Sequence, residues 1–123
     1  MSTGTSRYVD RIVVGSDGSA GARHARTWAA RRALAHGVGL TILRVSEKAT
    51  SRYAFTGAAL PYREQWLKEV RATAQAGLEA EVKEVQAELP DLSVTGEFRE
   101  TSNVALVLAQ IAAEADLLVL GAT

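Results

Sequence analysis

The chain has 123 residues, no cysteine, and fourteen basic (Lys, Arg) against fourteen acidic (Asp, Glu) side chains. This length predicts one domain over residues 1–123, and the lack of cysteine excludes a disulfide framework, a thiolate zinc site and cysteine catalysis, so a reducing cytoplasm is the expected location. A net charge of zero removes the bulk attraction to nucleic acid, and no apolar run approaches the ~20 residues of a membrane span, so neither nucleic acid nor a membrane is expected as a partner.

The charges are unevenly distributed along the chain. Residues 1–53 hold nine basic and three acidic side chains, a net charge of +6, whereas residues 54–123 hold five and eleven, a net charge of −6. Either the two halves face different ways and make a polar molecule, or consecutive helices carry opposite surface charge and meet through it; we favour the second interpretation.

The first predicted elements are a strand and a helix. The apolar run from Ile12 to Val14, stopped by Gly15, predicts a short strand buried on both faces. Ser19 can cap a following helix, because its hydroxyl can accept a hydrogen bond from a first-turn amide, and Gly37 suits the left-handed position past the helix end. The predicted buried stripe of this helix consists of Ala22, Ala25, Ala29 and Ala33, with Leu34 alongside.

A second strand is predicted over 40–45, followed by a loop over 46–62. Apolar side chains then recur every three or four residues, which predicts a long helix over 64–88 that Pro90 stops. The stripe of this helix consists of Leu67, Val70, Ala74, Leu78, Val82, Val85 and Leu89.

The last predicted elements are a strand over 94–98, a helix and a strand over 117–120. The alternation of apolar and polar side chains over 94–98 indicates a strand at the edge of the sheet, and Ser102 is the predicted cap of the next helix. Strands that alternate with helices predict an open, parallel α/β sheet with helices on both faces. The apolar positions of the last helix are Val104, Leu108, Ile111, Ala112 and Ala115.

Ligands of open α/β sheets bind outside the carboxyl ends of the strands, where the strand order reverses. This rule selects residues 15–18 after the first strand, 45–47 after the second and Gly121 after the fourth. The spacing of Gly15, Gly18 and Gly21 is not the dinucleotide-binding pattern, and the Walker pattern is absent. Asp17 can accept a hydrogen bond from an adenine amino group or a ribose hydroxyl, or it can bond its own turn; the residues alone leave both interpretations open.

Other candidate functional side chains have plainer interpretations. His24 and His36 lie too far apart on one helix to share a metal, so no metal site is predicted. Trp28 and Trp66 are predicted to pack helices. No set of nucleophile, base and orienting group can be assembled, so binding is favoured over catalysis. Four arginines of the first helix could attract phosphate, but a solvated face is favoured: Arg23, Arg26, Arg31 and Arg32.

Three segments resemble the universal stress protein family: residues 12–19, the alanine-rich helix with Trp28-Ala29-Ala30, and the closing run from Ala115 to Gly121. The resemblance spans the whole chain. It implies an open sheet of five parallel strands in the order 3-2-1-4-5, often a dimer, in a cytoplasmic stress-response or signalling protein. For this sequence we expect the order 3-2-1-4, because only four strands are predicted.

In family members that bind ATP, an aspartate after the first strand and backbone groups after the second lie near the adenine, which matches Asp17 and Val45. Their phosphates are held by the pattern G-x2-G-x9-G-[ST], whose first glycine matches Gly121. The sequence stops at Thr123, one residue before the second glycine, so the phosphate loop, last helix and last strand are absent from it. The resemblance therefore implies ATP or another adenine nucleotide as ligand of Gly15, Asp17, Gly18, Val45 and Gly121.

Three functions remain open from the sequence. The first is a regulatory domain that binds an adenine nucleotide or descends from one that does. The second is an interaction or dimerisation module of the same fold that binds no nucleotide, and the third is a slow ATPase. Without a fifth strand the apolar run 117–120 has an unpaired edge, so a homodimer or another association through this edge is expected.

Overall fold

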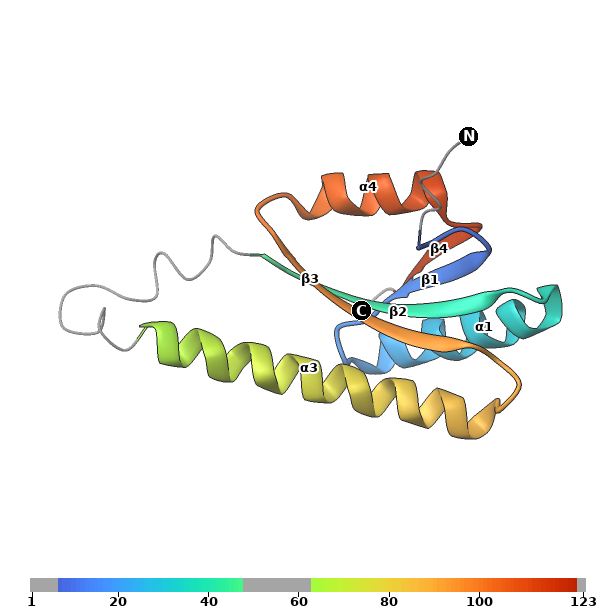
Figure 1. The fold of residues 1–123 in the computed structure, drawn as a ribbon, viewed down its shortest axis with the longest axis horizontal. Helices are drawn as coiled ribbons and strands as arrows, with labels where there is room; N and C mark the ends of the chain where they lie inside the picture. The colour runs from blue at the N-terminus through green and yellow to red at the C-terminus, as the bar shows by residue number, and fades with distance from the viewer. Residues whose placement is uncertain (1–6, 48–62, 122–123) are drawn as a thin grey trace.

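The computed structural model describes residues 7–47 and 63–121. Within these ranges the elements follow the predicted alternation of strand and helix (Figure 1). All strand pairs are parallel, in the order β3-β2-β1-β4, which confirms the predicted order 3-2-1-4. The elements are β1 (Arg11–Gly15), α1 (Ala20–His36), β2 (Gly39–Glu47), α3 (Arg63–Glu88), β3 (Val94–Thr101), α4 (Val104–Glu114) and β4 (Leu117–Leu120).

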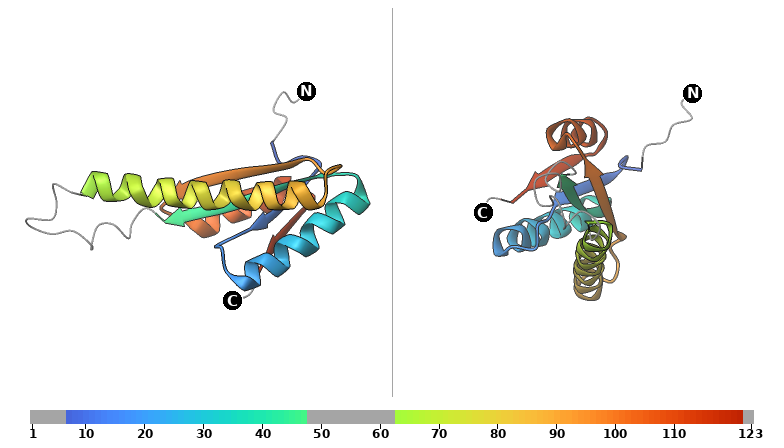
Figure 2. Two further views of the ribbon diagram at one scale, coloured as in Figure 1. Left: turned by 90° about the horizontal axis from the view of Figure 1, so that it is seen from below. Right: turned by 90° about the vertical axis from the view of Figure 1, so that its left-hand side faces the viewer.

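Helices cover both faces of the sheet, as predicted. Figure 2 shows α1 and α3 on one face and α4 on the other. Side chains of a strand alternate between the two faces, so Ile12 and Val14 of β1 join the core beneath α1 and α3, whereas Val13 joins the core beneath α4. All three are at most 2% exposed, which explains the continuous apolar run of this strand.

The predicted limits of α1 are confirmed, but its buried stripe differs from the prediction. Ser19 Oγ accepts a hydrogen bond from the amide of Ala22 at 3.2 Å, and Gly37 past the helix end has a φ of 68°. Leu34 is 41% exposed, and Ala30 is buried in its place. Successive residues of a helix point about 100° apart, so Leu34 lies too far round from Ala33 to reach the sheet.

The buried side chains of the long helix α3 all lie in its second half. Leu78 and Val85 are buried, whereas Val70 is 44% exposed. Figure 1 shows the first turns of α3 running beyond the strands, where no sheet surface lies beneath them. The prediction that both tryptophans pack between helices is wrong. Trp66 lies in these first turns of α3 and is 41% exposed, and Trp28 lies on the outer side of α1 and is 51% exposed.

The predicted cap of α4 is wrong. β3 continues to Thr101, and Asn103 caps the helix by accepting a hydrogen bond at Oδ1 from the amide of Leu106 at 3.0 Å. Ser102 is exposed instead. Val107 and Ile111 are the buried residues of α4, whereas the predicted core residue Ala112 is exposed, because it points about 100° round the helix from Ile111.

Strand limits also differ from the prediction. Ser46 and Glu47, predicted to begin a loop, continue β2 because they pair with Glu100 and Thr101 of β3. The rest of that predicted loop, 48–62, lies outside the described residues. β4 pairs only with β1 in the described part of the chain, and Leu120 at its end is 56% exposed. Among residues 7–47 and 63–121, no helix is both long and apolar enough to cross a membrane.

Candidate functional site

A pocket of about 190 Å³ lies on the α4 side of the sheet, at the carboxyl ends of β1, β2 and β4. Four of the five predicted site residues line it: Gly15, Asp17, Val45 and Gly121. We call it the α4-side pocket. It lies where the strand order reverses between β1 and β4, the position at which open α/β sheets bind ligands. The fifth predicted residue, Gly18, belongs to the same turn but does not line the pocket.

Glycine is required at the end of β4. A Cβ atom on Gly121 would lie 2.8 Å from the carbonyl oxygen of Gly21, a backbone atom that cannot move aside. The missing side chain therefore lets the end of β4 approach the first turn of α1. Gly18 is needed for a different reason, because its φ of 83° is a conformation that other residues rarely adopt.

Asp17 bonds its own turn, one of the two interpretations left open by the sequence. Its Oδ1 accepts a hydrogen bond from the amide of Ser19 at 2.9 Å. The hydroxyl and amide of Ser19 lower the pKa of Asp17, so the carboxylate is charged at neutral pH. A carboxylate has about four acceptor positions. The turn hydrogen bond therefore leaves Asp17, which is exposed, able to accept from a ligand as well.

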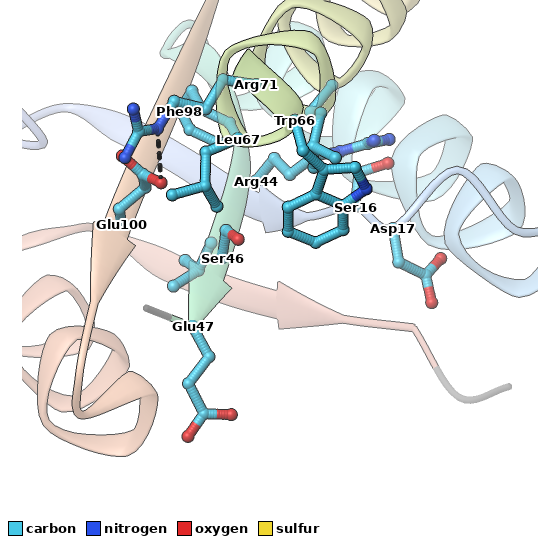
Figure 3. A pocket seen from close by; sticks show the side chains of 13 residues that line it. Ser16, Asp17, Arg44, Ser46, Glu47, Trp66, Leu67, Arg71, Phe98 and Glu100 are labelled. Carbon is cyan, nitrogen blue, oxygen red and sulfur yellow. Dashed lines mark hydrogen bonds and ion pairs between the residues drawn. The ribbon is translucent and has the colours of Figure 1, made fainter. Parts of the chain in front are cut away.

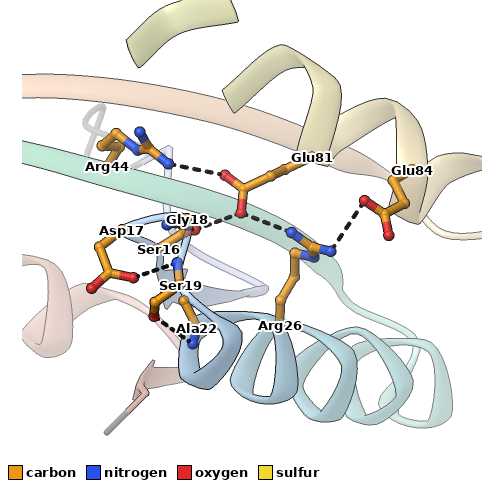
Figure 4. Close-up of polar contacts among 9 residues, drawn as sticks. All are labelled: Ser16, Asp17, Gly18, Ser19, Ala22, Arg26, Arg44, Glu81 and Glu84. Atoms are coloured by element: carbon orange, nitrogen blue, oxygen red, sulfur yellow. Dashed lines mark hydrogen bonds and ion pairs between the residues drawn. The ribbon is translucent and has the colours of Figure 1, made fainter. Parts of the chain in front are cut away.

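A charged cluster links this turn to α3 (Figure 4). Glu81 of α3 accepts at Oε1 from Ser16 Oγ at 2.6 Å and from Arg26 Nη1 at 2.7 Å. Arg44 of β2 lies 3.5 Å from the other oxygen of Glu81, and Arg26 also pairs with Glu84 at 3.3 Å. The cluster thus ties the β1–α1 turn to α1, β2 and α3.

The burial of Arg26 corrects the prediction of a solvated basic face. Arg26 is only 4% exposed, because its position lies in the middle of the alanine stripe that packs on the sheet. The position of Arg26 within the alanine stripe was visible in the sequence, and it could have identified Arg26 as a buried cation that requires a carboxylate partner. Arg23, Arg31 and Arg32 are exposed, as predicted, and so are both histidines.

A larger cleft of about 510 Å³ lies on the opposite, α3 side of β2 (Figure 3). Its lining includes five residues of the segments 15–18 and 45–47 that the strand-end rule selected, whereas the side chains from α3 and β3 were not predicted. We call it the Trp66 cleft. The two hollows share Ser16, Asp17 and Val45 as lining residues. The remaining lining residues of the Trp66 cleft are Arg44, Ser46, Glu47, Trp66, Leu67, Val70, Arg71, Ala74, Phe98 and Glu100.

A third hollow, of about 1200 Å³, lies between the outer side of α1 and β4. Arg23, Arg31 and Arg32 line it together with Trp28 and Leu120, and the guanidinium of Arg32 lies 5.3 Å from the centre of the Trp28 ring. None of the described residues that line this hollow is acidic. Within the described ranges, no group of three or more His, Asp or Glu side chains could hold a metal ion.

Comparisons with known proteins agree with this architecture. No curated protein matches the chain. The solved structure of universal stress protein UspA from Lactobacillus plantarum is similar, with a TM-score of 0.72 and 29% identity over 96% of this chain and 79% of that one. A protein of the universal stress protein family from Burkholderia pseudomallei has the same fold, with a TM-score of 0.68 and 24% identity over 95% of this chain and 84% of that one. The profile of the universal stress protein family matches residues 9–123, so the chain belongs to this family.

Proposed function

We propose that this universal stress protein binds an adenine nucleotide at the α4-side pocket and acts in the cytoplasm as a regulatory module in stress response or signalling, without catalysing a reaction. One observation carries the proposal. Asp17, Val45 and Gly121 are far apart in the sequence, yet they line one pocket at the point where the strand order reverses.

Each residue has a distinct role in this proposal. The ionised Asp17 accepts a hydrogen bond from the amino group of adenine or from a ribose hydroxyl, and Val45 contacts the base. Gly15 and Gly121 have no side chains, so the ligand can approach the backbone closely. Sites that enclose a ligand usually have volumes of about 300–1,000 Å³. A pocket of 190 Å³ therefore holds only part of a nucleotide, whose remainder extends outward past Gly121.

Isothermal titration calorimetry with ATP, ADP, AMP and cyclic AMP tests this proposal. We expect saturable binding of at least one nucleotide and at least ~10-fold weaker binding in Asp17→Ala, because a hydrogen bond to a charged group contributes about 1.5–3 kcal/mol. Asp116→Ala is the matched control, because it removes an exposed carboxylate at the opposite end of β4. Absence of binding at millimolar nucleotide, or equal binding in Asp17→Ala, would contradict the proposal.

The exposed edge of β4 favours a second function, association with another copy of the chain. Leu120 is 56% exposed, and no strand of the described ranges covers the outer edge of β4. Free strand edges pair readily with other chains. We expect light scattering to detect a dimer that Leu120→Lys converts to a monomer, whereas Leu106→Lys, at another exposed leucine away from the edge, leaves the dimer intact. A wild-type protein that stays monomeric at high concentration would exclude this function.

A further inference from the structure

We propose that the hollow between α1 and β4 is a docking groove for an extended, acidic segment of a partner protein. We call it the α1–β4 groove. This inference rests neither on nucleotide binding at the α4-side pocket nor on pairing of the β4 edge.

One side of α1 forms the floor of the groove. Gly21, Ala25, Trp28, Arg32 and Ala35 line it at spacings of four and three residues, which places them in one row along the helix. From Gly21 to Ala35 the helix rises ~21 Å, the length of about six residues of an extended chain. The volume of about 1200 Å³ exceeds the ~300–1,000 Å³ that is usual for small-molecule sites. These dimensions favour a short peptide segment as the occupant.

The charge of the groove is positive and uncompensated. Arg23, Arg31 and Arg32 line it, and no ion pair among the described residues involves any of the three. The parts of the sequence outside 7–47 and 63–121 contain no Asp or Glu, so they supply no carboxylate side chain either. The three guanidiniums therefore keep their donors for a partner, whose carboxylates they can bind through two parallel hydrogen bonds each.

The two walls of the groove also present apolar surface. Trp28 on α1 and Leu120 on β4 are both more than half exposed. The guanidinium of Arg32 lies 5.3 Å from the centre of the Trp28 ring, so a cation–π interaction helps to hold this arginine at the groove. Trp and Arg are the side chains that most often dominate the binding energy of protein interfaces. Successive side chains of an extended segment point to opposite sides, so acidic side chains toward α1 and apolar side chains toward β4 complement both walls.

The distribution of charge favours an acidic polypeptide over nucleic acid. Residues 54–123 carry a net charge of −6, which repels a continuous phosphate backbone wherever it extends beyond the groove. A segment with a few carboxylates carries its charge only where the arginines lie. Val119 and Leu120 also give the β4 wall aliphatic side chains, which suit leucine-like side chains of a peptide.

Isothermal titration calorimetry with a hexapeptide of alternating glutamate and leucine, blocked at both ends, tests the proposal on the 123-residue chain. We expect saturable binding, and weaker binding of the lysine–leucine counterpart and of hexathymidylate. The double variant Arg31→Gln/Arg32→Gln should bind the acidic peptide at least ~10-fold more weakly, because hydrogen bonds to charged groups are lost. Trp28→Leu should weaken binding at least ~5-fold.

The double variant Lys68→Gln/Lys83→Gln is the matched control, because it removes the same charge from exposed positions of α3. It should leave binding of the acidic peptide unchanged. An equal loss in both double variants would show that net charge alone attracts the peptide, and equal binding in the arginine variant would exclude the groove.

Two further results would overturn the proposal. Tighter binding of hexathymidylate than of the acidic peptide would assign the groove to nucleic acid, and absence of saturable binding at millimolar peptide would exclude the docking site. Should the arginine variant fail to fold by circular dichroism, Trp28→Leu decides the test, because Trp28 is exposed and its replacement disturbs no core.

Discussion

Oε1 of Glu81 lies 2.7 Å from Nη1 of Arg26, and this ion pair joins α1 to α3 through two residues that are 55 apart in the sequence. The side chains of Arg26 and Glu81 are 5% and 12% exposed. Removing one partner of a buried pair leaves the other charge without compensation, which costs about 3–5 kcal/mol. The pair therefore fixes how α1 and α3 pack, and the β1–α1 turn, which bonds Glu81 through Ser16, depends on it.

We expect Glu81→Gln to lower the free energy of unfolding by about 3 kcal/mol, because Arg26 stays buried without a carboxylate. Urea unfolding followed by circular dichroism measures the change. Glu84→Gln is the matched control, since its carboxylate is 46% exposed and 3.3 Å from Arg26, and it should cost less than about 1 kcal/mol. Equal effects of the two variants would contradict a special role of Glu81.

Tyr8 should stabilise the protein in a pH-dependent manner. Its hydroxyl donates to Glu97 Oε2 at 2.6 Å and accepts from Arg99 Nη1 at 3.0 Å. Burial, followed by the hydrogen bond to Glu97, raises the pKa of Tyr8 above its ordinary value of 10.0. The folded state thus holds the phenolic proton more tightly than the unfolded state. The contribution of the Tyr8 hydroxyl to the free energy of unfolding is therefore complete below pH ~10 and is lost as the pH rises through the higher pKa of the folded state.

We therefore expect Tyr8→Phe to lower the free energy of unfolding by about 1.5–3 kcal/mol at neutral pH, because a hydrogen bond to a charged group is lost. The difference between wild type and variant should shrink in alkaline solution. Thermal unfolding at pH values from neutral to above 10 measures both effects. A difference that stays constant over this range would show that the hydroxyl proton contributes nothing.

Two glycines should respond to alanine in opposite directions. Gly77 lies inside α3, and a Cβ atom there would meet only Arg44 Nη1, at 4.0 Å. Gly77→Ala should therefore stabilise the protein by about 0.8–1 kcal/mol, the difference in helix propensity. Gly121→Ala should destabilise it, because its Cβ atom would clash with the backbone at 2.8 Å. Chemical unfolding of the two variants beside wild type checks both signs.

Asn103 rather than Ser102 should control the start of α4. Asn103→Ala removes the Oδ1 acceptor of the Leu106 amide and should cost about 1 kcal/mol of stability. Ser102→Ala should change the stability by less than about 0.5 kcal/mol, as exposed positions without such a contact do. Thermal melts of both variants test the assignment, and a larger effect at Ser102 would favour the cap predicted from the sequence.

The sequence predicted the helices on both faces and the caps of α1, and its resemblance to the universal stress protein family implied the strand order. The first two features depend on neighbours within a few residues, such as the Ile12–Val14 run and Ser19 before Ala22, or on rules that hold for all parallel α/β sheets. It also selected Asp17, Val45 and Gly121, since the carboxyl ends of parallel strands always lie at one edge of a sheet.

Only the tertiary structure decided which polar side chains meet at that edge. The spacing of apolar residues predicts a helix face but not the partner of a charge on it, so Arg26 was interpreted as solvated until α3 brought Glu81 beside it. In the same way, the periodicity of α3 does not reveal where the sheet beneath it ends, and that limit exposes Trp66. Trp66 and Arg44 are 22 residues apart and line one cleft, because α3 packs on the face of the sheet to which Arg44 points.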